Sequence, residues 1–449
     1  MIASQVGLIR EVKERATALA SVVLYVASYH YSYKYLISPA YSYQGFVYQP
    51  LGFYVVLTAY ILSLLPVMFM PLHLRKPSSF VVWMLYLMVY VPSLLTMAFV
   101  LGRPLYEMGP FLLSLLVSML LLALVVRFPI IPLPMPRIPG WLFWGGLGVY
   151  LVGSYGLLID VFGFNGLASL SNVYDVRLKA RATLAGAGRL VGYQLRWLSE
   201  AINPYLMATG LSEKKTWLFV MGAIGQVIIY SFDATKSTLG SIVLIAAVFF
   251  LVTRSFRLRA SSLALAFTAL FWVVALADGM YRVGLTGLLT RRLFAVPGLL
   301  TSVYYDFFSS HDRFYWLHTT YAKLLGMSGS NYPDYKSPGF LIGDVFFGNP
   351  EGNANANLWA DGYANAGILG VLLVTVIFMA ILWIYDSVSF KKDIRVALLL
   401  IAMPTFAITN TSLLTALLSH GWLPAIFLLW FSGGLQKRPR RSDNKGGCV

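Results

Sequence analysis

Long apolar runs alternate with short polar connections along the whole chain. Twelve runs approach the roughly 20 apolar residues that a helix needs to cross a bilayer, and no soluble domain interrupts them. The runs begin near Ala16, Leu51, Phe80, Gly109, Trp141, Arg189, Thr216, Ser237, Ser261, Asp361, Ile394 and Leu413. This pattern predicts an all-α polytopic membrane protein with about 12 transmembrane helices, in which residues 1–449 form a single integral membrane domain.

Two segments depart from this pattern. Leu293–Phe308 is apolar but is bounded by charged residues on both sides. We predict a re-entrant or interfacial helix there, broken by Pro297 and Gly298. Residues 281–360, which include this segment, form the longest connection between predicted spans, which predicts one large external loop with helical segments inside it.

The composition excludes a soluble protein. Apolar residues make up 58% of the chain and charged residues 12%, whereas ordinary globular domains carry about 25% charged residues. The net charge of +16 would suggest a nucleic-acid partner in a soluble protein. Here basic cytoplasmic connections explain it, so we expect no nucleic acid.

The ends of the chain add two expectations. The first 15 residues are charged and lack a small-residue cleavage site, so we expect no removable signal peptide. The lone cysteine, Cys448, excludes an intrachain disulfide or a cysteine metal cluster.

The basic residues predict the orientation. If the N-terminus is cytoplasmic, 20 of the 34 lysines and arginines fall in cytoplasmic segments and 12 on the external side. The remaining two, Lys34 and Arg196, lie inside spans. This distribution follows the positive-inside rule. It predicts a multi-pass membrane protein with both termini and the Lys391–Arg395 connection in the cytoplasm.

A basic external loop runs from about Asp160 to Gly188. Its Arg177, Lys179 and Arg181 depart from the positive-inside trend. They either form a solvated loop that touches anionic headgroups or bind a phosphate, to which the planar arginine fork is well suited.

Arg196, Glu200 and Lys236 are charges at or inside predicted spans. Arg196 and Glu200 are four residues apart, so they either pair with each other or face a cavity. Lys236 opens a helix, where an amine is unfavourable unless an anion bridges it to the helix end. Snorkelling of the lysine to the interface is the alternative.

The large external loop is rich in aromatic residues and holds six basic and five acidic residues. Aromatic faces beside carboxylates and amides suit a sugar, although the aromatics could instead form the core of a folded cap. His311 and His318 are too few for a metal site. The loop ends in NPEGNANANLWADGYANAGILG, where small residues would let a backbone or a ligand approach closely. Asp361 in this stretch could also simply favour a helix N-terminus.

Four stretches together resemble the bacterial O-antigen (repeat-unit) polymerases of the Wzy type. They are RLVGYQLRWLSEAIN from Arg189, DATKS around Lys236, RRLFAVPGLLTSVYYDFF from Arg291 and NANANLWADGYANAGILG from Asn353. The resemblance covers roughly residues 180–375. The related O-antigen ligases typically have a histidine before the pre-helix asparagine. This chain has Ala356 before Asn357, which favours a polymerase.

The resemblance implies a metal-independent glycosyltransferase of polysaccharide and lipopolysaccharide biosynthesis in the bacterial inner membrane, with the large loop, residues 281–360, in the periplasm. Its donor and acceptor would be undecaprenyl-pyrophosphate oligosaccharides in the membrane lipid, with a chain-length regulator protein as a possible partner and no cofactor. The candidate pyrophosphate ligands are Arg189, Arg196, Lys236, Arg291 and Arg292. The candidate sugar ligands are Asn353, Asn355, Asn357, Tyr304 and Tyr305. The candidates for activating the attacking hydroxyl are Asp361, Glu351 and His311.

Three rival functions remain. A ligase would transfer a finished chain, and a flippase of lipid-linked oligosaccharide would also need a cationic cavity, although the sequence shows no internal repeat typical of transporters. A structural envelope protein would leave Arg196, Glu200 and Lys236 unexplained.

Overall fold

The fold is all-helical over the residues that the structure describes. The computed structural model describes residues 2–103, 105–163, 173–254, 259–327, 329–390 and 392–432. Within these ranges there is no β-strand, and the one bridge joins His73 to Arg259. The all-α part of the predicted fold class is therefore confirmed.

The helices have the following bounds. The N-terminal part contains α1 (Ile2–Ser32), η1 (Tyr33–Ile37), α2 (Ser38–Tyr41), η2 (Ser42–Gln44), α3 (Phe53–Leu64), η3 (Leu65–Met68), α4 (Pro77–Leu85), η4 (Tyr86–Tyr90), α5 (Val91–Leu101) and α6 (Leu105–Val125). The middle part contains α7 (Gly140–Phe162), α8 (Val173–Ala187), α9 (Arg189–Trp197), η5 (Leu198–Ile202), α10 (Asn203–Ser212), α11 (Thr216–Asp233), α12 (Lys236–Arg254) and α13 (Ala260–Tyr281). The C-terminal part contains η6 (Thr286–Ala295), α14 (Val296–Ser310), α15 (Thr320–Leu324), α16 (Pro338–Val345), α17 (Leu358–Ser389), α18 (Ile394–Ile408), α19 (Leu413–Ser419) and α20 (Trp422–Phe431).

Among the described residues, six helices are long and apolar enough to cross a membrane. They are Pro77–Leu101, Tyr106–Val125, Gly140–Phe162, Thr216–Asp233, Ala260–Tyr281 and Leu358–Ser389. The broken pair α19 and α20 makes a seventh if it is one span. Twelve spans are not supported, because several apolar runs form shorter helices, such as Phe53–Met68 and Ile394–Ile408.

The apolar segment before the large loop differs from its prediction. The π-helix η6 continues directly into α14, and helical backbone angles at Ala295 join the two. Pro297 lies where the chain passes from π-helical to α-helical geometry. The predicted break at Pro297 and Gly298 is therefore wrong, because the backbone stays helical through both residues.

The chain forms two compact units. Unit 1 comprises Met1–Pro129, Ala246–Asp386 and Ile401–His420, and unit 2 comprises Ile130–Ile245, Ser387–Leu400 and the residues from Gly421 onwards. In unit 1, α1 packs on α13 and α14 packs on α5. In unit 2, α10 packs on α11, and α9 contacts α8.

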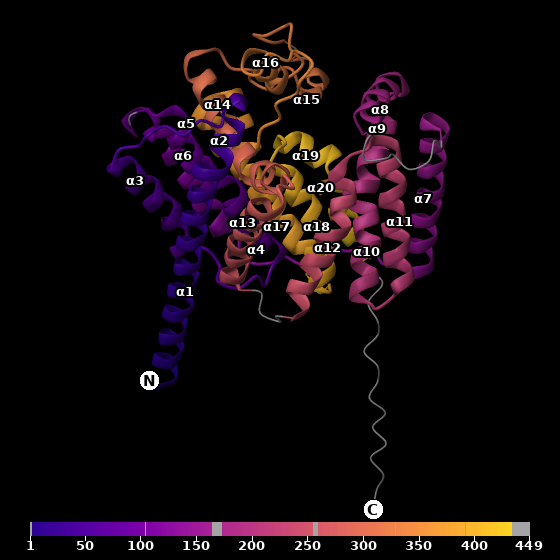
Figure 1. Cartoon of the computed structure of the whole chain (residues 1–449). Helices are drawn as coiled ribbons and strands as arrows, with labels where there is room; N and C mark the ends of the chain where they lie inside the picture. Colours follow the sequence, from indigo (N-terminus) through magenta and orange to yellow (C-terminus); the bar gives the residue numbers. More distant parts are fainter. Residues whose placement is uncertain are drawn as a thin grey trace, which may run out of the picture. The chain divides into compact units, whose positions relative to one another are not determined.

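Basic side chains tie helix ends together at one end of unit 1. Arg15 donates to the carbonyls of Val67 and Met68 at 2.9 and 2.8 Å. Lys76 donates to the carbonyls of Val126 and Phe128 at 2.8 Å each. We call this the basic end, defined by Arg10, Lys13, Arg15, Lys76, Arg127 and Arg259. In Figure 1 the N-terminus marks this end, and α15 and α16 lie at the opposite end of the unit. The sequence predicts that all six residues lie on the same side of the membrane.

Candidate active site at a re-entrant helical arm

The chain reverses direction within α17. Ala366 and Gly367 have non-helical backbone angles, and Gly367 has φ 61° and ψ −144°, which essentially only glycine adopts. The Trp359 indole donates to Thr375 Oγ1 at 3.0 Å. In a straight helix these residues would be about 24 Å apart along the axis. Residues 358–365 therefore form a short arm that folds back along a long arm, residues 368–389.

Glycines allow the two arms to touch. A Cβ atom on Gly362 would lie 2.8 Å from the carbonyl oxygen of Gly370, and one on Gly370 would lie 2.0 Å from that of Gly362. Either side chain would force the arms apart. The small residues after the asparagines thus serve a close approach between backbones.

Polar side chains stabilise both ends of the short arm. Asn357 is fully buried, and its Oδ1 accepts from the backbone N–H groups of Trp359 and Ala360 at 3.0 and 3.2 Å. At the other end, Arg313 donates to the carbonyl of Tyr363 at 3.1 Å, with its guanidinium 4.4 Å above the Tyr363 ring. An N-cap and a C-terminal cation are both favourable for a helix that is too short to be stable alone.

Asp361 lies in the middle of the short arm. The sequence suggests that a membrane span begins there, but the long arm starts only after the reversal. The Asp361 carboxyl lies beside the Trp316 indole and interacts electrostatically with Tyr304. Over the described ranges Asp361 forms no ion pair. A partly buried carboxyl without a cationic partner can accept a hydrogen bond or a proton from a ligand.

Helix α14 supports the arm from the side. Thr301 accepts a hydrogen bond from Asn357 at 2.8 Å. The Tyr304 hydroxyl donates to the Ala354 carbonyl at 2.9 Å, and the Tyr305 hydroxyl donates to the Glu107 carbonyl at 2.8 Å. Tyr304 and Tyr305 are buried, so in this structure their hydroxyls hold neighbouring segments in place.

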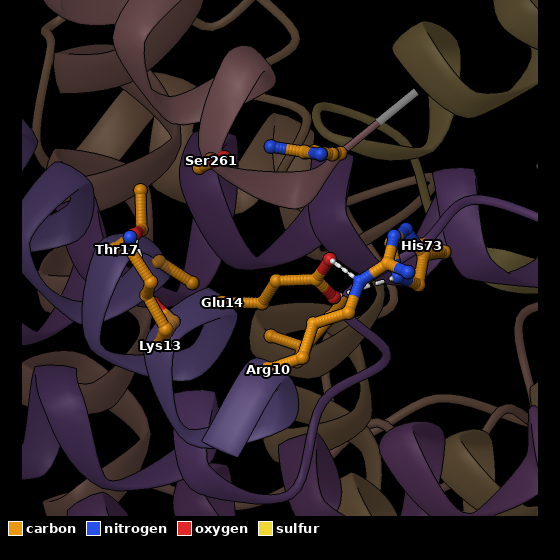
Figure 2. Close-up of a pocket in the computed structure, with 9 residues that line it drawn as sticks. Arg10, Lys13, Glu14, Thr17, His73 and Ser261 are labelled. Carbon is orange, nitrogen blue, oxygen red and sulfur yellow. Dashed lines mark hydrogen bonds and ion pairs between the residues drawn. The ribbon is translucent and has the colours of Figure 1, made fainter. Parts of the chain in front are cut away.

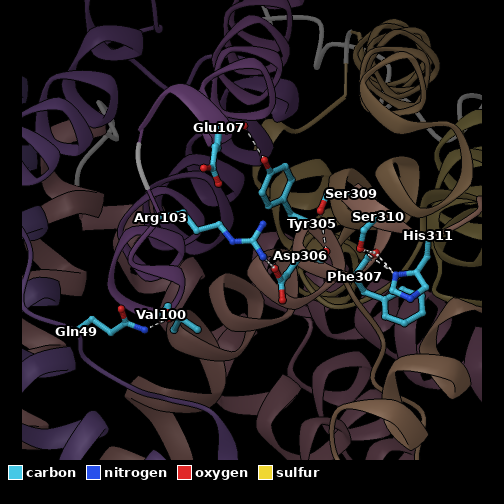
Figure 3. Close-up of polar contacts among 10 residues, drawn as sticks. All are labelled: Gln49, Val100, Arg103, Glu107, Tyr305, Asp306, Phe307, Ser309, Ser310 and His311. Atoms are coloured by element: carbon cyan, nitrogen blue, oxygen red, sulfur yellow. Dashed lines mark hydrogen bonds and ion pairs between the residues drawn. The ribbon is translucent and has the colours of Figure 1, made fainter.

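An ion pair and a histidine lie at the C-terminal end of α14 (Figure 3). Arg103 pairs with Asp306, beside the Tyr305 contact to Glu107. The exposed His311 ring stacks on Phe307, with centroids 4.1 Å apart, and its Nδ1 lies 2.8 Å from the Phe307 carbonyl oxygen. One ring nitrogen is thereby engaged, which leaves Nε2 for other contacts.

The asparagine stretch lies against α16. A Cβ atom on Gly339 would meet Asn353 Oδ1 at 2.0 Å and Asn355 Oδ1 at 3.4 Å. Both asparagines are exposed, as is Glu351 in the preceding turn. Asn353 and Asn355 can therefore reach a ligand on the surface of the loop, whereas the hydrogen bonds of Asn357 are made inside the protein.

Arg291 and Arg292 lie in η6 and have different surroundings. Arg291 donates to Gln44 Oε1 at 2.7 Å and lies 4.3 Å from the centre of the Tyr41 ring. Its Nε is buried without a hydrogen-bond partner in the described chain. Arg292 is exposed.

The remaining three predicted cations belong to unit 2. Arg196 lies 3.9 Å from Asp233, with which it forms an ion pair, and is not paired with Glu200. The π-helical η5 begins between Arg196 and Glu200 and shifts their register, so a four-residue spacing no longer aligns them. Lys236 begins α12 three residues after Asp233, and Arg177 donates to the Ala234 carbonyl at 3.2 Å. Arg177, Arg196 and Lys236 thus surround the α11–α12 turn, while Arg189 is exposed at the start of α9.

Three residues of the unit 1 site were not among the predicted site residues. Arg313 follows Asp312, and such adjacent opposite charges indicate a solvated position. Trp316 is one of many loop aromatics, and Arg103 is an isolated basic residue between two spans. Only the reversal of α17 and the position of α14 bring them close to Asp361 or Tyr305.

Comparisons with known proteins add no relative. No protein-family model, curated protein or solved structure matches the chain.

Proposed function

We propose that the chain is a membrane glycosyltransferase that polymerises undecaprenyl-pyrophosphate-linked oligosaccharide repeat units into O-antigen or a related surface polysaccharide. One observation carries the proposal: the Asp361 carboxyl, on a re-entrant arm and without an ion-pair partner in the described chain, lies beside Trp316 of the aromatic loop. The resemblance of residues 180–375 to Wzy-type polymerases points to the same chemistry.

The reaction exchanges one bond for another. The anomeric C–O bond to the pyrophosphate of the growing chain breaks, and a hydroxyl at the non-reducing end of a new lipid-linked unit forms the glycosidic bond. Asp361 accepts the hydroxyl proton, and the departing pyrophosphate takes the bonding electron pair. Glu351 and His311 are the second and third candidates for this base.

Cations and amides have separate roles in the proposal. Arg291 and Arg292, in the same unit as Asp361, stabilise the pyrophosphate as negative charge develops on it. Arg189, Arg196 and Lys236 are the candidate phosphate ligands of unit 2. Asn353 and Asn355 bind sugar hydroxyls. Tyr304, Tyr305 and Asn357 act by holding α14, the asparagine stretch and the short arm together.

The proposed location is the bacterial inner membrane. The basic end of unit 1 and both termini face the cytoplasm, where basic residues are favoured. The loop that contains α15 and α16 then faces outwards, and polymerisation takes place on the external face.

A transporter of lipid-linked oligosaccharide is the second candidate. The re-entrant arm favours it, because transporters commonly bind substrates at discontinuous helices in the membrane. A transporter would move the lipid-linked unit between leaflets without lengthening it.

The decisive experiment supplies the purified full chain in liposomes with one lipid-linked repeat unit. We expect a ladder of longer products. Asp361→Asn and Asp361→Ala should lower the rate of polymerisation by at least about 100-fold. Asp334→Asn, an exposed carboxyl of the same loop, is the matched control and should retain activity. Movement of the lipid-linked unit between leaflets without a ladder of products would show a transporter and would contradict the polymerase. A normal ladder in both Asp361 variants would remove Asp361 as the base.

A further inference from the structure

A cavity of about 260 Å³ lies at the basic end of unit 1 (Figure 2). It is lined by Arg10, Lys13, Glu14, Thr17, Ala18, Leu72, His73, Arg259 and Ser261. These residues come from α1, from the connection before α4 and from the start of α13. The connection is held to α13 by a hydrogen bond from the Ala260 N–H to the Leu72 carbonyl at 3.0 Å. The volume suits a small polar group better than an oligosaccharide.

Positive charge exceeds negative charge in this cavity. The carboxyl of Glu14 accepts from Arg10 Nε at 3.2 Å and contacts His73 Nε2 at 2.9 Å, as Figure 2 shows. Glu14 is thereby engaged by two partners. Lys13 and Arg259, in contrast, form no ion pair with any described residue. Two cations are left to bind an anion.

An exposed apolar stripe leads away from the cavity along α13. Ser261 lines the cavity, and Leu265, Trp272 and Leu276 follow at spacings of four, seven and four residues, which place them on one helix face. These three side chains are 44%, 44% and 62% exposed. Because α13 is long and apolar enough to cross a membrane, this stripe is suited to contact with acyl chains.

We propose that the cavity binds the phosphate of an anionic phospholipid such as phosphatidylglycerol. Lys13 and Arg259 contact the phosphate, and the acyl chains lie along Leu265, Trp272 and Leu276. Basic pockets between membrane helices on the cytoplasmic side bind such headgroups. A free phosphate would use the same cations but not the stripe. The proposal does not depend on the glycosyltransferase activity.

The test uses the full chain purified in an uncharged detergent. Native mass spectrometry would compare phosphatidylglycerol, phosphatidylcholine with the same chains, and inorganic phosphate. We expect phosphatidylglycerol to bind most tightly. Removing both charges with Lys13→Gln and Arg259→Gln should weaken it roughly 30-fold. Arg75→Gln removes an exposed arginine outside the cavity and should change binding by less than about threefold.

Two further variants keep the test decisive. Arg259→Lys retains the charge and should keep most of the affinity, which separates charge from folding. If the double variant does not fold, Lys13→Gln alone should weaken phosphatidylglycerol about fivefold. Equal binding of the two lipids, or unchanged affinity in a folded charge-removal variant, would overturn the site. Inorganic phosphate binding as tightly as phosphatidylglycerol would overturn the assignment to a lipid.

Discussion

Single side chains hold the two ends of the short arm, and neither is interchangeable with a neighbour. Asn357 supplies one oxygen to two backbone donors, and Arg313 combines a hydrogen bond with a contact to an aromatic face. Asn353 and Asn355 have the same chemistry as Asn357 but are exposed. Position relative to the helix start therefore separates a capping residue from a candidate ligand.

Replacing Arg313 tests the C-terminal end of the arm. Arg313→Ala should lower the free energy of unfolding by about 1–2 kcal/mol, because it removes a cation from a helix C-terminus and a cation–π contact. Arg313→Lys should recover part of the loss, since it keeps the charge but not the planar fork. Lys323→Ala, at an exposed position of the same loop, is the control. Equal effects of Arg313→Ala and Lys323→Ala on denaturant unfolding would contradict this role.

His318 makes the loop between α14 and α17 sensitive to acid. Burial, helped by the charge of Lys323, lowers the pKa of His318 to about 4. The unfolded chain has the ordinary histidine pKa near 6.5, so it takes up a proton first as pH falls. The free energy of unfolding should be highest above about pH 6.5 and should decrease as the pH falls towards 4. At pH 5 it should be about 1–2 kcal/mol lower than at pH 7. Thermal unfolding at pH 7 and pH 5 measures this difference.

Two histidine variants distinguish this explanation from a general acid effect. His318→Phe removes the titrating group and should flatten the pH profile. His311→Gln changes an exposed histidine and should leave the profile unchanged. A profile that is equally steep in wild type and His318→Phe would assign the acid sensitivity to other groups.

At the scale of elements, composition identified the helices but not their reversals. The run from Asp361 is apolar and helical as predicted, yet Ala366 and Gly367 fold its first residues back. Neither residue is a reliable breaker in a sequence, because glycine and alanine are common within membrane helices. The register shift of η5 was equally invisible, since it separates Arg196 from Glu200 without any change in residue type. Both features depend on packing partners that are distant in the sequence.

Glycine substitutions test the contact between the arms. Gly370→Ala would place Cβ 2.0 Å from the Gly362 carbonyl oxygen and should cost about 1–3 kcal/mol. Gly367→Ala should cost a similar amount through backbone strain at φ 61°. Gly153→Ala in α7 is the matched control, because a Cβ atom at that position would have no neighbour within 4 Å. Denaturant unfolding that ranks Gly153→Ala as the most harmful of the three would refute the packing argument.

A carboxylate near the C-terminal end of the long arm caps α4. Asp386 accepts from the Ser78 N–H at 2.9 Å and from its hydroxyl at 2.6 Å. Asp386→Ala should cost about 2 kcal/mol, because it leaves these buried donors without a partner. Glu213→Ala breaks an exposed pair with Lys215 and should cost well under 1 kcal/mol. Similar shifts in the unfolding midpoint for both variants would show that the cap contributes little.

At the scale of the molecule, the charge pattern and the apolar pattern predict different properties. The basic residues predict an orientation, because basic connections are favoured on the cytoplasmic side. The number of spans could not be read in the same way. Apolar residues also fill helices that are too short to cross, and composition does not distinguish the two.

Orientation can be measured with single cysteines. After Cys448 is replaced, Asp334→Cys should react with an impermeant maleimide from outside, and Asp393→Cys should react only after the membrane is opened. Both positions are exposed in the structure. Labelling of intact cells at 393 and not at 334 would invert the proposed topology and exclude an external active site.

The reversal at Ala366–Gly367 also determines the order in which the two arms reach their places during biosynthesis. The eight residues of the short arm leave the ribosome before the long arm but are far too short to be integrated as a span. The long arm must enter the bilayer first, and the short arm can dock on it only afterwards. Docking brings Asp361 close to its neighbours. A newly made chain is therefore inserted in the membrane before its candidate site is assembled. Pulse-labelled protein should therefore acquire protease resistance around residue 361 later than it acquires its membrane topology.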